Sequence, residues 1–216
     1  LDAAFVEGFH FNSRPTFHVG VLSSMHSLQE LELRSWHSLR LGEAAPLLPS
    51  LTKLLIGPGV TDAEINASLP SLQLLQVSGC HNLHIAGQQL SLASLSALKL
   101  GNVHIMGYVD FGGMPALRHL EVRRAAGLQT TGLASLSCLS SLEIAYEDPA
   151  TQAVASSLLS IAPTTVHTLC DSSSGSLALL SHGSLTQLTC IVSKRTSIIP
   201  HLAPLLQLQE LKFLDV

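Results

Sequence analysis

Apolar residues recur along the whole chain in one short pattern, in which they hold the first, fourth and sixth positions of a six-residue stretch. The clear copies are LQELEL (28–33), LTKLLI (51–56), LQLLQV (72–77), LSALKL (95–100), LRHLEV (117–122), LSSLEI (139–144), LTQLTC (185–190) and LQELKF (208–213). Two degenerate copies, VEGFHF (6–11) and VHTLCD (166–171), fill the gaps between them. Successive copies start 21 to 23 residues apart, except for adjacent intervals of 27 and 19. Such a period predicts a repeat array.

Within each copy, the last three positions alternate apolar, variable, apolar. This alternation is typical of a strand with one buried face. A further apolar residue often precedes the copy by three positions, as Leu48 and Leu92 do, and another often follows its last apolar residue by six, as Leu83 does. No repeat can bury its apolar face alone, so neighbouring repeats must cover it. We therefore expect one sheet of about ten parallel strands.

The full pattern, LxxLxxLxLxxxxxL, resembles the leucine-rich repeat family over essentially the whole chain. The resemblance implies an α/β solenoid: a horseshoe with one parallel β-sheet on the concave face and short helices, 3₁₀ turns or loops on the convex face. We expect a single array of about ten plain repeats over 1–216. The last copy ends at Phe213, so we expect the array to continue beyond at least the C-terminal end.

Three places depart from a regular array. The asparagine that the family usually has three positions after the last strand leucine is absent, so the turns must satisfy their backbone groups in another way. Other residue types stand there, namely Trp36, Gly59, Cys80, Val103, Ala125, Glu147, Ser174 and Ser193. Asp171 falls on a core position of the eighth copy. Asp148-Pro149 and the apolar spacing of Val154, Leu158 and Ile161 predict a convex helix that stops at Pro163.

Composition and charge exclude two classes of partner. The net charge is −4 with a pI near 6.2, and the 11 Lys and Arg are scattered, so we expect no nucleic-acid binding. Three stretches without charge, 65–98, 149–170 and 172–193, are interrupted by Pro, Gln, Asn, His or Ser. We therefore expect no membrane insertion.

The four cysteines indicate a compartment. Cys80, Cys138, Cys170 and Cys190 show neither CxxC spacing nor clusters that would cap the array with disulfides. One glycosylation sequon, Asn66-Ala67-Ser68, points weakly the other way, since a three-residue match arises readily by chance. We expect an intracellular, cytoplasmic protein with free thiols.

No group of residues indicates catalysis, a cofactor or a metal. Cys80-His81-Asn82-Leu83-His84 is the densest histidine cluster, but it has no carboxylate nearby, and surface-turn histidines explain it better than a metal site does. The serine run 172–176 lacks the frame of a nucleophile elbow. His119 and Glu121 share a strand face, as solvated pairs commonly do. We expect the chain not to be an enzyme.

Charge gathers on the predicted concave face. A third of the positions flanking and between the strand leucines are charged, against 12% of the chain. In the two degenerate copies these positions fall on Gly8, His10 and Asn12, and on Thr168, Cys170 and Ser172. Leu55 and Leu74 are expected side by side within a charged rim, which is the anatomy of a small interface core. The candidate partner-binding residues are Glu30, Glu32, Arg34, Lys53, Leu55, Leu74, Gln76, Lys99, His119, Glu121, Arg123 and Glu143.

These observations predict a non-catalytic module that binds another protein on its concave sheet, as a substrate-recognition arm or a scaffold. Two alternatives stay open: a fragment of the ectodomain of an extracellular leucine-rich repeat receptor, and a repeat domain attached to an enzyme that lies outside the chain. The sequence carries no signal for an oligomeric state. Sequence on either side of the array would separate the three functions.

Overall fold

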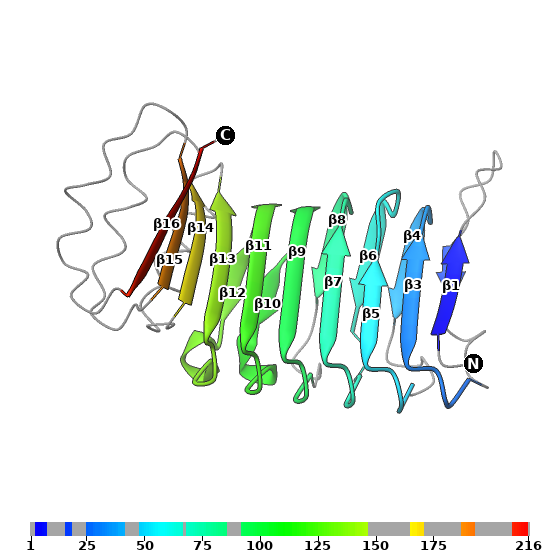
Figure 1. Ribbon diagram of the computed structural model, residues 1–216. Helices are drawn as coiled ribbons and strands as arrows, with labels where there is room; N and C mark the ends of the chain where they lie inside the picture. Colours follow the sequence, from blue (N-terminus) through cyan, green and yellow to red (C-terminus); the bar gives the residue numbers. More distant parts are fainter. Residues whose placement is uncertain are drawn as a thin grey trace.

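The chain folds into a solenoid whose strands stack in two walls (Figure 1). The computed structural model describes residues 3–7, 16–18, 25–41, 48–66, 68–85, 92–146, 165–170, 187–192 and 209–215. The front wall is one sheet of ten strands, and every neighbouring pair in it is parallel. This sheet confirms the predicted parallel-sheet solenoid of the leucine-rich repeat type.

The strands of the front wall are the predicted apolar copies, in chain order. They are β1 (Ala3–Glu7), β3 (Glu30–Arg34), β5 (Lys53–Ile56), β7 (Leu74–Ser78), β9 (Ala97–His104), β11 (His119–Ala126), β13 (Ser141–Tyr146), β14 (Thr165–Cys170), β15 (Gln187–Val192) and β16 (Glu210–Asp215). In β3, Leu31 and Leu33 are fully buried while Glu32 between them faces outward. The same alternation runs through β5, β7, β9 and β11.

The back wall consists of short strands that the sequence reading did not predict. A four-stranded parallel sheet holds β2 (Thr16–His18), β4 (Ser38–Leu41), β6 (Asp62–Ile65) and β8 (Asn82–Ile85). A two-stranded parallel sheet holds β10 (Tyr108–Asp110) and β12 (Gln129–Thr131), and one bridge between Leu83 and Ile105 joins the two sheets. The short 3₁₀ helices η2 (Phe111–Gly113) and η3 (Leu133–Ser135) follow β10 and β12 and agree with the predicted 3₁₀ turns.

The two walls enclose one hydrophobic core. Leu31, Leu54, Leu75 and Leu98 of the front wall and Leu39 of the back wall all belong to it, each with no exposed surface. Burial of such side chains stabilises a fold by about 1.5–3 kcal/mol each. Each repeat from β3 to β13 adds one layer to this core, so an inner layer is covered by the layers on either side.

The turns between the walls satisfy their backbone polar groups without the asparagine that the repeat pattern usually has. At the position where that asparagine was expected, Cys80, Val103 and Ala125 are buried and extend the core. Backbone groups of neighbouring turns hydrogen-bond to each other, and Gly79 N donates to Gly101 O at 2.9 Å. The chain reverses through a residue at positive φ, which is Ser35, Gly79, Asn102 or Arg124 two positions after the last strand leucine or valine, and Gly59 one position later in the turn that follows β5.

A ladder of hydroxyl groups links the other ends of the front strands. Thr52 Oγ1 donates to Gln29 O at 3.0 Å, Ser96 Oγ to Gln73 O at 3.1 Å, and Ser140 Oγ to Arg118 O at 3.2 Å. Each hydroxyl reaches the carbonyl that its own backbone N–H also contacts. From β3 to β13 these hydroxyl donors occur in every second repeat. In the repeats between them the same position, which directly follows the first leucine of the copy, is Gln29, Gln73 or Arg118.

One junction of the back wall depends on a glycine. Asp110 Oδ1 accepts hydrogen bonds from Gly112 N at 3.0 Å and from Thr131 Oγ1 at 3.1 Å, so it ties η2 to β12. Gly132 follows at φ +69°, and a Cβ there would lie 2.3 Å from Gly112 N. A side chain at this position therefore collides with backbone, and only glycine fits.

The structure corrects the register of both degenerate copies. In the front sheet Ala4 and Val6 pair with Leu31 and Leu33, where Phe9 and Phe11 were expected. In this register Ala3, Phe5 and Glu7 pair with Glu30, Glu32 and Arg34, the positions at which Gly8, His10 and Asn12 were expected.

In the eighth copy, Val166 and Thr168 pair with Leu142 and Ile144. Val166 therefore follows Leu142 by 24 positions and precedes Leu188 by 22, and the irregular intervals disappear. In this register Thr165, His167 and Leu169 pair with Ser141, Glu143 and Ala145, the positions at which Thr168, Cys170 and Ser172 were expected. Asp171 lies outside the described residues, as does the helix expected after Asp148-Pro149.

Candidate binding face

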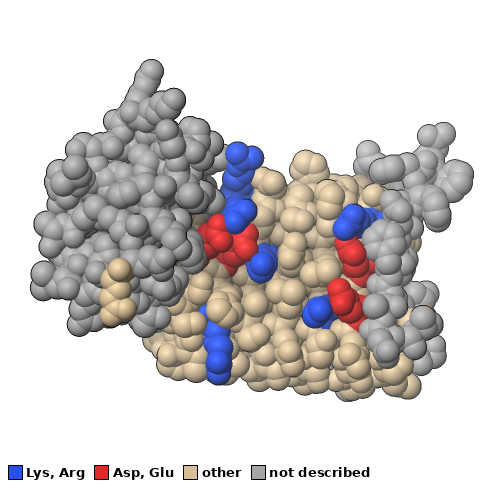
Figure 2. Space-filling model, in the orientation of Figure 1, with Lys and Arg blue, Asp and Glu red and all other residues tan. Residues whose placement is uncertain are grey.

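The side of the ten-stranded sheet that points away from the core, called the front face below, is the predicted concave face. Parallel pairing places its residues in rows across the strands, so that Glu32, Leu55, Gln76, Lys99, Glu121 and Glu143 form the middle row. Figure 2 shows two charged areas on this face with an uncharged area between them. These three areas hold eleven of the twelve candidate residues, all except His119.

The first charged area, the N-terminal cluster, consists of Glu30, Glu32, Arg34 and Lys53 on β3 and β5. Arg34 Nε donates to Glu32 Oε1 at 2.6 Å, and Lys53 Nζ lies 3.4 Å from Glu30 Oε2. The cluster holds two acids and two bases, so it is neutral as a whole. Its charged groups are partly exposed, and surface ion pairs of this kind contribute about 0.2–1 kcal/mol each.

Gly57, which follows β5, allows the Arg34 side chain to lie over the neighbouring strand. A Cβ at Gly57 would lie 2.7 Å from Arg34 Cγ, so the methylene groups of Arg34 cover the glycine directly. Gly57 is buried as a result. The sequence places Arg34 and Gly57 in the same row but does not indicate that the arginine side chain lies over the glycine, so the sequence analysis did not predict this contact.

The second charged area, the C-terminal cluster, consists of Lys99, Glu121, Arg123 and Glu143 on β9, β11 and β13. Lys99 Nζ lies 3.5 Å from Glu121 Oε2, and Arg123 Nε lies 3.0 Å from Glu121 Oε1 and donates to Glu143 Oε1 at 3.0 Å. Arg123 thus bridges two carboxylates on neighbouring strands. This cluster also balances two acids with two bases.

The uncharged area between the clusters, called the central strip, consists of Leu55, Leu74, Gln76, Ser78, Ala97 and Gly101. Leu55 and Leu74 are half-buried and stand outside the core, so the sequence reading correctly placed them on the face. They are diagonal neighbours and not direct partners, because Leu55 pairs with Gln76 and Leu74 with Lys53. Diagonal residues on adjacent strands are still within reach of long side chains.

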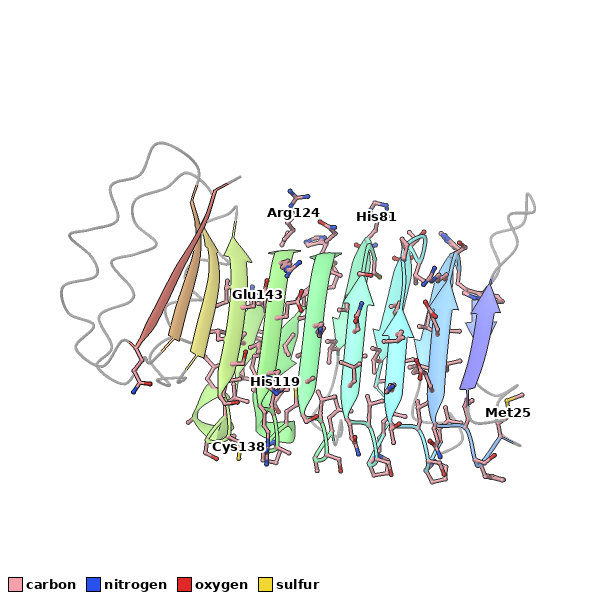
Figure 3. All side chains as sticks on the ribbon, viewed as in Figure 1. Met25, His81, His119, Arg124, Cys138 and Glu143 are labelled. Atoms are coloured by element: carbon pink, nitrogen blue, oxygen red, sulfur yellow. The ribbon has the colours of Figure 1, made fainter. Side chains whose placement is uncertain are left out.

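His119 is the one candidate residue that lies in neither charged cluster nor in the central strip. It is exposed at the start of β11, beside Ala97 and Ser141 in register and two positions before Glu121. In Figure 3 its side chain lies near the lower end of the sheet, away from Glu143. The twelve candidates therefore fall into two ion-paired clusters, three residues of the strip and one exposed histidine.

The back face carries its own polar contacts, which the sequence reading missed. Asn82 Nδ2 donates to Asp62 Oδ1 at 2.6 Å, and Arg40 Nε lies 3.9 Å from Glu64 Oε2. Met106 and Tyr108 are the exposed large hydrophobic residues of the described chain. The sequence analysis did not predict the short back strands, so it could not assign these residues to the outward face.

The histidine cluster at 80–84 separates into core and surface. Cys80 is buried, and its Sγ lies 3.2 Å from Asn82 O, whereas His81 in the turn and His84 on β8 are exposed. Burial raises the pKa of the Cys80 thiol to about 11, so the reactive thiolate is scarce at neutral pH. Figure 3 shows His81 at the upper edge of the sheet, pointing away from it. Among the described residues, no three His, Cys, Asp or Glu side chains gather closely enough to hold a metal ion.

Comparison with known proteins yields similar solved structures but no matching family. No family model matches the chain, and no curated protein matches it. A similar solved structure is an internalin from Listeria monocytogenes, with 18% sequence identity and a TM-score of 0.37. The match covers 100% of this chain and 62% of the internalin chain, so the chain spans less than two thirds of that protein's length.

Within the described residues, no helix is long and apolar enough to cross a membrane.

Proposed function

We propose that this chain is a non-catalytic protein-interaction module that binds another protein on its front face. The central strip is the observation that carries the proposal. Leu55 and Leu74 stay out of the core in the middle of a face whose charged residues pair with one another. A partly exposed apolar centre inside a polar rim is the usual arrangement of a protein interface.

The energetics favour the strip over the charged clusters as the source of affinity. The ion pairs on either side are half exposed and screened by salt, so they add little to stability or affinity. Covering two leucines removes apolar surface from water, and a few such side chains supply most of the binding energy in an interface. The clusters then act by limiting which partners can approach.

The proposed setting is the inside of a cell, where the module, built of plain repeats of about 22 residues, serves as a recognition arm or scaffold. The free thiols of Cys80 and Cys138 support a reducing compartment, because disulfides persist mainly in oxidising ones. The rigid, stacked strands support a scaffold role, since they hold the face in one shape before a partner arrives. Fractionation of cells that express the tagged chain tests the compartment.

Site-specific photo-crosslinking tests the use of the front face. Benzoylphenylalanine is placed at Gln76 on the strip, or at His84 on the back face as the matched control, and crosslinked proteins are identified by mass spectrometry. We expect the same protein to crosslink from Gln76 and not from His84. Leu55→Glu should weaken binding to that protein by about 1–3 kcal/mol, whereas Arg40→Glu on the back face should not. Capture from His84 alone would assign binding to the back face and overturn the proposal.

A further inference from the structure

We infer that the partner of the central strip is an acidic protein segment with an apolar centre, an inference that rests on the proposed function. The three strands beneath the strip, β5, β7 and β9, are described throughout and carry no Asp or Glu. Of the charged side chains that border the strip, four are basic: Lys53 on β5, Lys99 on β9, Arg34 lying over Gly57, and Arg123, the register partner of Gly101. The one acid at the border is Glu32, the register partner of Leu55, and Arg34 binds its carboxylate.

This ordering makes the face electrostatically uneven although each cluster is neutral. A segment that covers the strip meets four cations and a single carboxylate, that of Glu32, which Arg34 already binds. A basic segment would place like charges against Lys53 and Lys99, which disfavours binding, whereas an acidic segment meets opposite charges. Charge complementarity therefore selects an acidic partner over a basic one.

The two lysines are able to change partners at small cost. Lys53 Nζ lies 3.4 Å from Glu30 and Lys99 Nζ 3.5 Å from Glu121, both longer than a strong charge-assisted hydrogen bond. Their side chains are 52% and 45% exposed. Pairs this exposed are weakly held, and a lysine head on its flexible stem can contact a second carboxylate.

The spacing of the lysines fixes the form of the segment. β5 and β9 are separated by β7, and Lys99 lies two register positions farther along than Lys53, so the two lysines are about 12 Å apart on the diagonal at ~4.8 Å per strand and ~3.3 Å per residue. Leu55 lies on the same strand as Lys53, and Leu74 lies on the strand between the lysines. Successive side chains of an extended peptide point to opposite faces, so acids that both face the sheet must be an even number of residues apart, and a separation of four residues spans about 13 Å. The expected segment therefore has two acids four positions apart, with an apolar residue midway between them that faces the leucines.

A selection from random peptides tests the inference directly. A phage-displayed library of random 12-residue peptides is panned against the whole chain, and phage that also bind the Leu55→Glu variant are removed. We expect the surviving sequences to be enriched in two acidic residues that flank apolar ones. Enrichment of basic sequences, or no enrichment over the unselected library, would overturn the inference.

Charge reversal sharpens the test with the peptide that the selection enriches most, measured by fluorescence anisotropy. Lys53→Glu and Lys99→Glu should each weaken its binding by about three- to tenfold. Arg118→Glu makes the same charge change at an exposed position outside the strip and serves as the matched control. A Lys-for-acid version of the peptide should prefer the Lys53→Glu, Lys99→Glu double variant over the parent. Equal binding to the parent and the double variant would contradict the assigned role of the lysines, and circular dichroism checks that each variant is folded.

The two proposals fail in distinguishable ways. If crosslinking from Gln76 captures a protein but the selected peptides are basic or uncharged, the front face binds a partner of another chemistry, and only the inference is wrong. If crosslinking occurs from His84 alone and no peptide is enriched, the proposed function is wrong as well.

Discussion

The front and back walls of the solenoid are built from the same repeats but differ in regularity. The front wall runs unbroken through ten strands, whereas the described back wall divides into sheets of four and two strands. Each front strand carries apolar residues at alternate positions at a nearly constant interval. The back strands are short and lie in the return segments, whose length and turn chemistry vary from repeat to repeat.

This difference indicates where the sequence is constrained. A one-residue slip in the front wall would turn its leucines outward, so the register there is fixed by burial. At the break in the back wall, one bridge between Leu83 and Ile105 replaces a ladder, and a 3₁₀ helix follows each of the next two strands. The front wall therefore presents an ordered face, and the back wall absorbs the differences between repeats.

The largest expected effect tests whether the two walls share one core. Leu98 on β9 and Leu83 on β8 are both fully buried. We expect Leu98→Ala and Leu83→Ala to lower the free energy of unfolding by similar amounts, about 2–5 kcal/mol each, because both leave a cavity. Urea-induced unfolding followed by circular dichroism measures it. A loss below about 1 kcal/mol for Leu83→Ala alone would mean that the back wall is not part of the cooperative core.

A smaller effect, which depends on pH, concerns the turn that joins the walls at Cys80. The thiol's pKa rises from 9.0 to about 11 in the folded chain, chiefly through burial. Between these values the unfolded chain loses the thiol proton and the folded chain keeps it, so stability is full below pH 9 and falls as pH rises toward 11. The loss attributable to Cys80 should reach about 2–3 kcal/mol.

Cys80→Ala is the matched variant, because it keeps Cys138 and all other groups that titrate in this range. The stability advantage of the parent over Cys80→Ala should shrink between pH 9 and pH 11. An advantage that stays constant over this range would show that the thiol ionises alike in both states.

The smallest expected effect compares two turns of the front wall. Arg124 and Asn102 both have positive φ, 52° and 51°. Arginine adopts this conformation at a cost that asparagine largely escapes, since asparagine tolerates the left-handed region. We expect Arg124→Gly to raise the free energy of unfolding by about 0.5 kcal/mol and Asn102→Gly to change it less. Thermal unfolding compares the two, and a larger gain at Asn102 would contradict the strain argument.

The front wall and the rows of the candidate site were predictable because burial imposes a period of two on each strand. The clear copies placed Glu32, Leu55 and Glu121 on the correct face. The degenerate copies did not determine their own register, since Ala4 and Thr168 pair with Leu31 and Ile144 and neither residue marks a core position in a sequence. The back strands could not be predicted, because runs as short as Ser38–Leu41 cannot be distinguished from a loop by their sequence pattern.

The side-chain contacts within the site could not be predicted from the sequence for a different reason. The pattern shows which charged residues share a face, but it does not show that Arg123 bridges Glu121 and Glu143 or that the Arg34 side chain lies over Gly57. These contacts depend on the conformations of side chains on neighbouring strands. The same limit applied to Leu55 and Leu74, whose diagonal relation follows from the strand register and not from their spacing.

The hydroxyl ladder has a consequence for how such a chain changes in evolution. Its donors, Thr52, Ser96 and Ser140, hydrogen-bond to the main-chain carbonyls of Gln29, Gln73 and Arg118. Every residue has such a carbonyl whatever its side chain, so a hydroxyl at this position finds an acceptor in any preceding repeat. One repeat can therefore be gained or lost without leaving a hydroxyl of the ladder unbonded, and the unit that is inherited is the single repeat that the leucines define.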